Sequence, residues 1–554
     1  MNVRTLLCGG VFLLSGLMAD AQEQQPVFSA PFDFPLLLSG NFGELRTNHF
    51  HGGLDFKTGG QSGKAIMALA DGYIAQIKVT NGSGCVLEVK YDNGYYTINR
   101  HLSAFMPEIQ KRVTDLQYEK KRYQVTITPG VDEYRVRRGE QIGWSGNTGF
   151  SFGPHLHLDV IESATGKSVD PMPMFASELK DTMAPKAFGF RLFPQLGKGA
   201  VNGQTDDVKL AVGELEVPTA WGEIGVGIRA YDYMDGTTNK YGVKYVTLNV
   251  DGETVFKSVV DQYASYENPY INSWVVEDYM KSYLEPGNRL RMLTAYNGNR
   301  GLLTIDEERE YQLEYILSDE MGNSSVYRLR IEGKRQEIPE VDTKGRNYWA
   351  RTRTNVIHEP GMQLVVPKGM LYDDHLMRTK VLVDSSAVAY TYQLHDKPFA
   401  LHQAKGELSI GLMRKPVADK RKYFVAKVSP SGKLSSVGGR YDNGFMRVNI
   451  RQIGTYTVAV DTVAPVVKTV NAEKWSSTGR IVFSMSDKLT GISWFTGTID
   501  GKFAVFGRRN MTQNLYECEL DEKHFPKTGK KRKVEMIAAD GCGNKTVCRT
   551  SFVW

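Results

Sequence analysis

Residues 153–160 read GPHLHLDV, and this stretch decides how the N-terminal part of the chain folds and what it can bind. Side chains two residues apart in a strand project from the same face, so His155 and His157 lie side by side. Leu156 and Leu158 then face a core. Two imidazoles on one wall of a groove can bind a metal ion together, or divide the work between metal ligand and proton donor. The stretch therefore predicts a strand that lines a functional groove.

A second stretch with metal-binding residue types, NHFHGGLDF, occupies residues 48–56. Gly52 and Gly53 argue against a helix here, so His51 and Asp55 must converge through a turn between short extended segments. Two imidazoles and one carboxylate, with a fourth position open to water, are typical of hydrolytic zinc. Structural zinc more often has four protein ligands that include cysteines. Cysteine is rare in this chain, with only 5 residues, so we favour a hydrolytic zinc site.

Together these residues resemble the lysostaphin-type (LytM-like) zinc endopeptidases, which cut peptidoglycan. The pattern of that family is H-x-x-x-D, then a histidine in H-L-S near the end of a later strand, then H-x-H after Gly-Pro. This chain has all of these in order, with GWSGNTG just before the last motif. The resemblance implies an antiparallel β-sheet peptidase domain in which His51, Asp55 and His157 bind one zinc ion. It also implies that His101 and His155 are the catalytic pair.

The chemistry implied by this set of residues is hydrolysis of an amide. Bound zinc lowers the pKa of water from about 15.7 to near 7 and can polarise a scissile carbonyl. Proton transfer needs a positioned acid or base, and the imidazoles of His101 and His155 titrate in a suitable range. The sequence leaves open which of the two is the base. Asp159 is expected to be a polar groove or rim residue rather than a direct ligand, with a hydrogen bond to an imidazole as the alternative.

The segment between His101 and residue 136 is longer than in minimal relatives of this family. Within it, residues 105–123 carry apolar side chains at helix-like intervals, which predicts a short helix. An insertion between two site motifs is expected to lie at a groove wall, where it restricts access or selects the cross-link. The alternative is a surface segment that has no part in substrate access or selection.

The first residues have the features of a secretory signal peptide. MNVR places one cation before the apolar run LLCGGVFLLSGLMA, and Ala19-Asp20-Ala21 follows as an A-x-A-like cleavage site. The apolar run is short and interrupted by glycine, so a retained membrane anchor is the less favoured alternative. We therefore expect export to the periplasm or cell envelope, or secretion, after removal of residues 1–21.

Composition and charge exclude several classes of protein. The apolar fraction is 41% and the charged fraction 23%, as in ordinary globular proteins, which argues against wholesale disorder and against a polytopic membrane protein. A formal charge of +6 without a Lys/Arg-dense stripe argues against a nucleic-acid partner. One disulfide is possible among Cys518, Cys542 and Cys548, but its connectivity cannot be deduced.

Beyond the peptidase-like region the chain is predicted to be mainly β, with about three β-sandwich (Ig-like) domains. Internal repeats support this prediction: DTMAP at residues 181–185 recurs as DTVAP at 461–465, and DEMGN at 319–323 recurs as DGCGN at 540–544. The predicted order is a signal peptide (1–21), a lysostaphin-type zinc peptidase domain (22–180), a β-sandwich (181–346), a second, different β domain (347–461) and a C-terminal sandwich related to the first (462–554).

The resemblance favours a zinc metalloendopeptidase that acts on peptidoglycan stem peptides. A direct D-alanine cross-link is preferred over glycine bridges by analogy. Two other classes stay open. One is a non-catalytic envelope adaptor that activates other cell-wall hydrolases, and such adaptors typically lack some of the metal ligands. The other is a wall-binding scaffold that meets envelope proteins through its C-terminal β domains. The complete set of ligands favours the enzyme.

Overall fold

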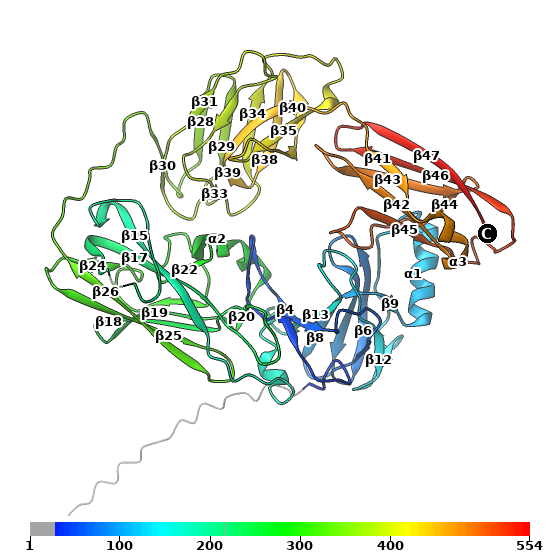
Figure 1. Cartoon of the computed structure of the whole chain (residues 1–554), viewed down its shortest axis with the longest axis horizontal. Coiled ribbons are helices and arrows are strands. Elements are labelled where there is room, and N and C mark those ends of the chain that lie inside the picture. The colour runs from blue at the N-terminus through cyan, green and yellow to red at the C-terminus, as the bar shows by residue number, and fades with distance from the viewer. Residues whose placement is uncertain (1–27, 215) are drawn as a thin grey trace, which may run out of the picture.

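The computed structural model of the chain describes residues 28–214 and 216–554. The predicted signal peptide, residues 1–21, lies outside the described residues. The chain is mainly β, which confirms the predicted fold class. In the described part, four domains follow one another round a closed ring, so that the C-terminal domain returns to the N-terminal one (Figure 1). None of the helices in this part is long and apolar enough to cross a membrane.

The N-terminal domain is built on an antiparallel sheet in which the strands of both sequence motifs are neighbours. Leu54, Phe56, Leu156 and Leu158 on these strands are fully buried, so one face of the sheet covers the core. The order of the main strands is β1 (Leu38–Gly40), β4 (Gly53–Lys57), β13 (His155–Glu162), β8 (Tyr95–Leu102), β7 (Gly84–Tyr91), β6 (Gly72–Thr80) and β10 (Val125–Ile127). A smaller sheet contains β5 (Ala65–Met67), β12 (Gln141–Trp144) and β9 (Ala104–Phe105).

The register of the three central strands places the site residues in one row. Asp55 of β4 lies opposite His157 of β13, and Arg100 of β8 lies opposite His157 on its other side. Because successive side chains of a strand point to opposite faces, the adjacent row, which contains Leu54 and Leu158, faces the core. The site and the core therefore occupy the two faces of the same sheet.

The helix predicted within residues 105–123 forms as α1 (Pro107–Lys120). Ile109 and Val113 on its inner side are buried in the core of the N-terminal domain. On its outer side Tyr118 stacks on His524 of the C-terminal domain, with 3.6 Å between the ring centroids. The helix is therefore an interdomain contact, a role that the sequence did not suggest. A cavity of about 890 Å³ lies between this insertion and the C-terminal domain.

The second domain packs directly against the N-terminal one, and each domain contributes side chains to the hydrophobic core of the other. Phe42 and Phe50 are buried in the core of the second domain, whereas Met234 and Tyr241 are buried in the core of the N-terminal domain. The strands of the second domain join into one continuous sheet, which includes β15 (Lys186–Val201), β17 (Thr219–Tyr231), β26 (Ser324–Gly333), β25 (Glu310–Ser318), β18 (Tyr245–Val250) and β19 (Glu253–Val259). The N-terminal domain is therefore not separated cleanly from the second domain.

Besides two smaller, two-stranded sheets, the third domain contains two five-stranded antiparallel sheets. One contains β28 (Asn355–Glu359), β29 (Met362–Val366), β34 (Gly406–Gly411), β38 (Phe445–Ile450) and β37 (Arg440–Asp442). The other contains β31 (Lys380–Leu382), β32 (Thr391–Gln393), β40 (Thr455–Val460), β35 (Tyr423–Val428) and β36 (Leu434–Gly438). Tyr372 donates a hydrogen bond to the carbonyl oxygen of Pro269 in the second domain, which links the two domains.

The C-terminal domain also has two sheets, one of β41 (Val466–Thr469), β42 (Arg480–Ser486) and β45 (Leu515–Glu519), and one of β44 (Lys502–Ala504), β43 (Ile492–Ile499), β46 (Lys531–Asp540) and β47 (Lys545–Val553). Lys422 of the third domain donates to the carbonyl oxygen of Cys542 at 3.2 Å. Cys518, Cys542 and Cys548 are free thiols, so the possible disulfide does not form.

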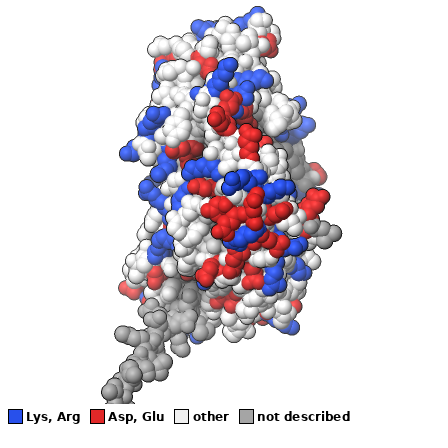
Figure 2. All heavy atoms as spheres, turned by 90° about the vertical axis from the view of Figure 1, so that its left-hand side faces the viewer, with Lys and Arg blue, Asp and Glu red and all other residues white. Residues whose placement is uncertain are grey.

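The face shown in Figure 2, to which the second domain contributes much of the surface, carries acidic and basic side chains close together. In that domain Arg328 pairs with Glu314 and Arg309 with Asp251, each at 2.8 Å. Exposed pairs of this kind contribute little stability.

Candidate metal and catalytic centre

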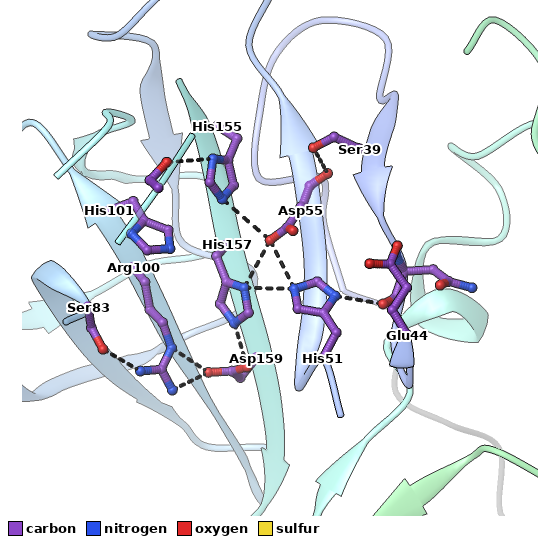
Figure 3. Close-up of polar contacts among 12 residues, drawn as sticks. Ser39, Glu44, His51, Asp55, Ser83, Arg100, His101, His155, His157 and Asp159 are labelled. Atoms are coloured by element: carbon purple, nitrogen blue, oxygen red, sulfur yellow. Dashed lines mark hydrogen bonds and ion pairs between the residues drawn. The ribbon is translucent and has the colours of Figure 1, made fainter. Parts of the chain in front are cut away.

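Three predicted residues bring their side chains together on the open face of the N-terminal sheet (Figure 3). His51 follows β3 (His49–Phe50), which pairs with β2 (Leu45–Arg46), while Asp55 lies on β4 and His157 on β13. His51 Nε2 lies 3.0 Å from Asp55 Oδ1 and 2.9 Å from His157 Nδ1. His157 Nδ1 is 2.9 Å from the same oxygen of Asp55. All three residues are buried, so these contacts lie out of bulk water.

The hydrogen bonds on the outer side of each imidazole decide which nitrogen faces this centre. His51 Nδ1 lies 2.6 Å from the carbonyl oxygen of Asn41, and because a carbonyl only accepts, Nδ1 carries the hydrogen. His157 Nε2 donates in the same way to the Asp159 carboxylate at 2.6 Å. His51 Nε2, His157 Nδ1 and Asp55 Oδ1 are then three acceptors that converge on one point. Such an arrangement suits a bound cation.

Two arginines that were not predicted from the sequence orient the carboxylates of this centre. Arg100 donates to Asp159 Oδ2 from Nε at 2.8 Å and from Nη2 at 2.6 Å. Arg46 donates to Asp55 Oδ2 at 3.1 Å, which leaves Oδ1 for the histidines. Asp159 thus takes the role given as the alternative, a hydrogen bond to an imidazole. Arg100 could have been found from the sequence, because it precedes His101 on a strand that was expected to line the site. In the structure this strand pairs with β13 and places Arg100 opposite His157.

The predicted catalytic pair lies beside the three acceptors. The rings of His101 and His155 have centroids 4.9 Å apart. His101 Nδ1 donates to the carbonyl oxygen of Thr148 at 2.7 Å, and His155 Nδ1 donates to that of Gly153 at 2.8 Å. In the neutral form of each ring, Nε2 is then the nitrogen without a hydrogen, and His155 Nε2 lies 3.5 Å from Asp55 Oδ1. His101 has a φ of 65°, a left-handed conformation that breaks the strand alternation at this residue.

The pKa values of the site residues reflect burial and mutual contact. Burial and the nearby His155 and His157 lower the pKa of His101 to about 3. Burial also disfavours charge on His157, but Asp159 and Asp55 outweigh it and raise the pKa of His157 to about 9. Burial would raise the pKa of Asp55, yet the surrounding imidazoles hold it well below its usual value. A proton and a metal ion thus compete for the same nitrogen of His157.

The loop of residues 147–153, which accepts the hydrogen bonds of both imidazoles of the predicted catalytic pair, is held by the C-terminal domain. Asn510 Nδ2 donates to the carbonyl oxygens of Asn147 at 2.8 Å and Ser151 at 2.9 Å. Gly149 forms a parallel bridge with Asn510. The sequence contains no signal for this contact, because the partners are separated by most of the chain.

The second domain holds the other side of the site. Asn41, whose carbonyl accepts the hydrogen bond of His51, exchanges two hydrogen bonds of 2.9 Å with the backbone of Gly242. The orientation of His51 therefore depends on residues outside the N-terminal domain.

Two exposed aromatic side chains lie in the loop near His155. Phe150 and Phe152 are 59% and 85% exposed, and their ring centroids are 5.3 Å apart. They form a small apolar area on the surface of this loop.

Comparison with known proteins gives matches to parts of the chain. Residues 346–461 match the Zu5-like domain family. The DD-carboxypeptidase/endopeptidase Mpg of Neisseria meningitidis serogroup B is 31% identical over 143 residues, which are 26% of this chain and 27% of that protein. The glycyl-glycine endopeptidase ALE-1 of Staphylococcus capitis is 28% identical over 147 residues, which are 26% of this chain and 32% of that protein.

A third relative is the peptidoglycan DD-endopeptidase ShyA of Vibrio cholerae serotype O1. It is 27% identical over 164 residues, which are 28% of this chain and 32% of that protein. The chain thus spans about a third of the length of these relatives, or less. The matches confirm the predicted resemblance to the lysostaphin-type family, and they leave most of the chain without a counterpart in these proteins.

Proposed function

Because the histidine-bearing domain is of the lysostaphin (LytM) type, we propose that the protein is a zinc-dependent endopeptidase that hydrolyses peptide cross-links of bacterial peptidoglycan. The observation that carries the proposal is the convergence of three buried ligand atoms beside two imidazoles whose Nδ1 atoms are hydrogen-bonded to backbone carbonyls. An adaptor without catalysis has no need of this complete set. The geometry therefore favours turnover over a silent site.

The donor set fits zinc. Two imidazole nitrogens, from His51 and His157, and one carboxylate oxygen, from Asp55, are the ligands of hydrolytic zinc sites that keep a position open for water. Asp159 and the Asn41 carbonyl hold the outer nitrogens of these imidazoles, as is usual for ligating histidines. When bound, zinc would supply Lewis acidity, which polarises a carbonyl and lowers the pKa of water to about 7.

The two remaining histidines are placed to move a proton. His101 and His155 hold hydrogen on Nδ1 through backbone carbonyls, so each can accept a proton on Nε2. His155 is next to the three acceptors, since its Nε2 lies 3.5 Å from Asp55 Oδ1. The ring of His101 lies beside that of His155, with 4.9 Å between the centroids. The low pKa of His101 keeps this ring neutral at physiological pH, so its Nε2 can accept a hydrogen bond.

The substrate bond proposed is the direct D-alanine cross-link between stem peptides. Two of the relatives above are named as D,D-peptidases and one as a glycyl-glycine endopeptidase, so the names alone do not decide between the bonds. The proposed location is the periplasm or cell envelope, or outside the cell, where this polymer lies. The β domains after the peptidase domain then offer surfaces for other envelope proteins.

Digestion of purified peptidoglycan by the zinc-loaded chain without residues 1–21, followed by mass spectrometry of the muropeptides, tests the proposal. The whole chain is needed because Phe42 and Phe50 are buried in the second domain. We expect cross-linked dimers with D-alanine bridges to become monomers, while glycine-bridged material stays intact. Cleavage of glycine bridges alone would overturn the bond assignment. No product from either polymer would overturn the enzyme itself.

A further inference from the structure

Three carboxylates meet in the second domain, outside the histidine site. Asp181 belongs to the segment that enters the domain, Asp232 follows β17, and Asp319 follows β25. One oxygen of each residue lies within 4.8 Å of the others. Asp232 and Asp319 are only 5% and 4% exposed. The negative charges are thus gathered at the point where the chain passes from the N-terminal to the second domain.

Protein donors contact all three carboxylates but leave one oxygen of Asp232 without a partner among the described residues. Asn323 donates to both oxygens of Asp319, from its backbone N at 2.9 Å and from Nδ2 at 2.8 Å. The backbone N–H of Met183 donates to Asp181 at 2.9 Å. Oδ1 of Asp232, in contrast, is buried and has no hydrogen-bond partner among the described residues. A buried carboxylate oxygen without a partner is costly, so this atom points to a ligand.

The electrostatic surroundings of Asp232 agree with this geometry. Burial and the charges of Asp181 and Asp319 raise the pKa of Asp232 to about 8, and no cation is among the charged groups acting on it. Three carboxylates this close repel one another in a site shielded from water. A positive charge between them would relieve both the repulsion and the missing contact.

The internal repeat supplies a natural comparison in Asp461, Asp487 and Asp540 of the C-terminal domain, which form the equivalent cluster. Asn544 contacts Asp540 and the Asp461 carbonyl, as Asn323 contacts Asp319 and the Asp181 carbonyl.

The C-terminal copy has additional donors. The Thr490 hydroxyl donates to Asp461 at 2.8 Å, and the backbone N–H groups of residues 489–491 donate to Asp487 at 2.8 to 3.0 Å. The second domain has no such donor for Asp232 Oδ1. In the C-terminal domain, protein N–H and O–H groups thus stabilise the carboxylates, whereas in the second domain a bound cation would have this role.

We propose that Asp181, Asp232 and Asp319 bind a calcium ion in the second domain. A set made only of carboxylates suits a hard cation and not zinc, which prefers nitrogen and sulfur ligands. Calcium lies about 2.3 to 2.6 Å from its ligands, so two oxygens on one ion are separated by at most about 5 Å. The spacing of the three oxygens is within this limit. Magnesium, with bonds of about 2.0 to 2.1 Å, would need oxygens no more than about 4 Å apart.

The site would tie the entry segment of the second domain to two of its strand ends. Asp181 lies between the domains, whereas Asp232 and Asp319 belong to the sheet. Asp232 also exchanges backbone hydrogen bonds of 3.0 Å with Tyr241, whose ring is buried in the N-terminal core. Calcium bound here would fix the second domain against the domain that carries the histidines.

Calorimetric titration of calcium chloride into the zinc-loaded, calcium-free chain tests the proposal. We expect Asp232→Asn to lose one equivalent of bound calcium relative to the unsubstituted chain, and Asp487→Asn, in the equivalent cluster, to lose none. Calcium should raise the Tm of the unsubstituted chain by about 5 °C, because a ligand that binds only the folded state stabilises it. The Tm of Asp232→Asn should not respond.

Asp232→Asn removes charge repulsion without changing shape, so the variant should fold. Unchanged zinc content and circular dichroism check this. Equal calcium binding by Asp232→Asn and the unsubstituted chain would overturn the proposal, as would an absence of calcium binding. A Tm increase of the same size with magnesium would overturn the assignment to calcium.

Discussion

Asn510 donates a hydrogen bond of 2.9 Å to the carbonyl oxygen of Ser151, although 359 residues separate them in the chain. Ser151 lies in the loop whose carbonyls accept the Nδ1–H groups of His101 and His155. The C-terminal domain therefore touches the loop that orients the proposed catalytic pair. Closure of the ring of domains and the geometry of the site are physically connected.

Removing this contact should reduce turnover without removing the metal. Asn510→Ala deletes both hydrogen bonds to the loop, and small misplacements of reacting groups cost up to about 10²-fold. We expect kcat to fall by about tenfold, with unchanged zinc content and little change in KM. Gln513→Ala, an exposed residue of the same segment, is the matched control. Equal kcat in Asn510→Ala and the control would show that the loop keeps its shape without the Asn510 side chain, through the backbone bridge to Gly149.

The proposed metal ligands can be tested by metal content. His51→Ala or Asp55→Ala should leave two ligands, which cannot hold the ion in a defined geometry, so both zinc and activity should be lost. His49→Ala is the control, because His49 is exposed and outside the cluster. Metal analysis showing about one zinc per chain in the ligand variants would reject the assignment.

The proposed catalytic pair should behave differently from the ligands. His101→Ala and His155→Ala should keep most of the zinc and lose about 10²- to 10⁴-fold in kcat, the usual contribution of a general acid or base. Rates on a cross-linked muropeptide and zinc content of the same preparations decide this. A metal-free His155→Ala protein would mean that ligand and base had been exchanged.

Asp159 should increase the affinity for zinc through its hydrogen bond to His157 Nε2. Asp159→Asn keeps the shape but weakens the hydrogen bond to Nε2 and leaves Arg100 without its ion pair. Loss of such a partner typically weakens metal binding by about 10- to 100-fold. Competition with a chelator of known affinity measures the change. Unaltered affinity would show that the His157 ring is oriented by packing alone.

Acid should destabilise the metal-free protein through His101. Its pKa is lowered from 6.5 to about 3 in the folded state, so the unfolded chain binds this proton first as the pH falls. This histidine therefore costs stability progressively below pH ~6.5. We expect the free energy of unfolding to fall less in His101→Gln between pH 7 and pH 4.5, by roughly 2 to 3 kcal/mol. Urea titrations at the two pH values measure it, and equal losses would contradict the burial argument.

The relationships within each sequence motif were predictable because they are local. His155 and His157 share a face through the two-residue repeat of a strand, and the glycines between His51 and Asp55 indicate a turn. The order of the motifs added His101 through the family resemblance. Mainly β structure followed from alternating apolar runs and turn residues, which also depend only on neighbouring positions.

The supports of the site could not be predicted in this way. Arg46, on the short β2–β3 hairpin, donates a hydrogen bond to Asp55. Asn41 is hydrogen-bonded to Gly242 of the second domain. Asn510 of the C-terminal domain donates to the loop near His155. The contacts of Asn41 and Asn510 join segments whose proximity depends on how whole domains pack. Sequence periodicity describes which face a side chain occupies, but it contains no information on which distant surface will cover that face. The interdomain hydrogen bonds that hold Asn41 and the loop of residues 147–153 are therefore decided by the packing of the domains, which only the tertiary structure shows.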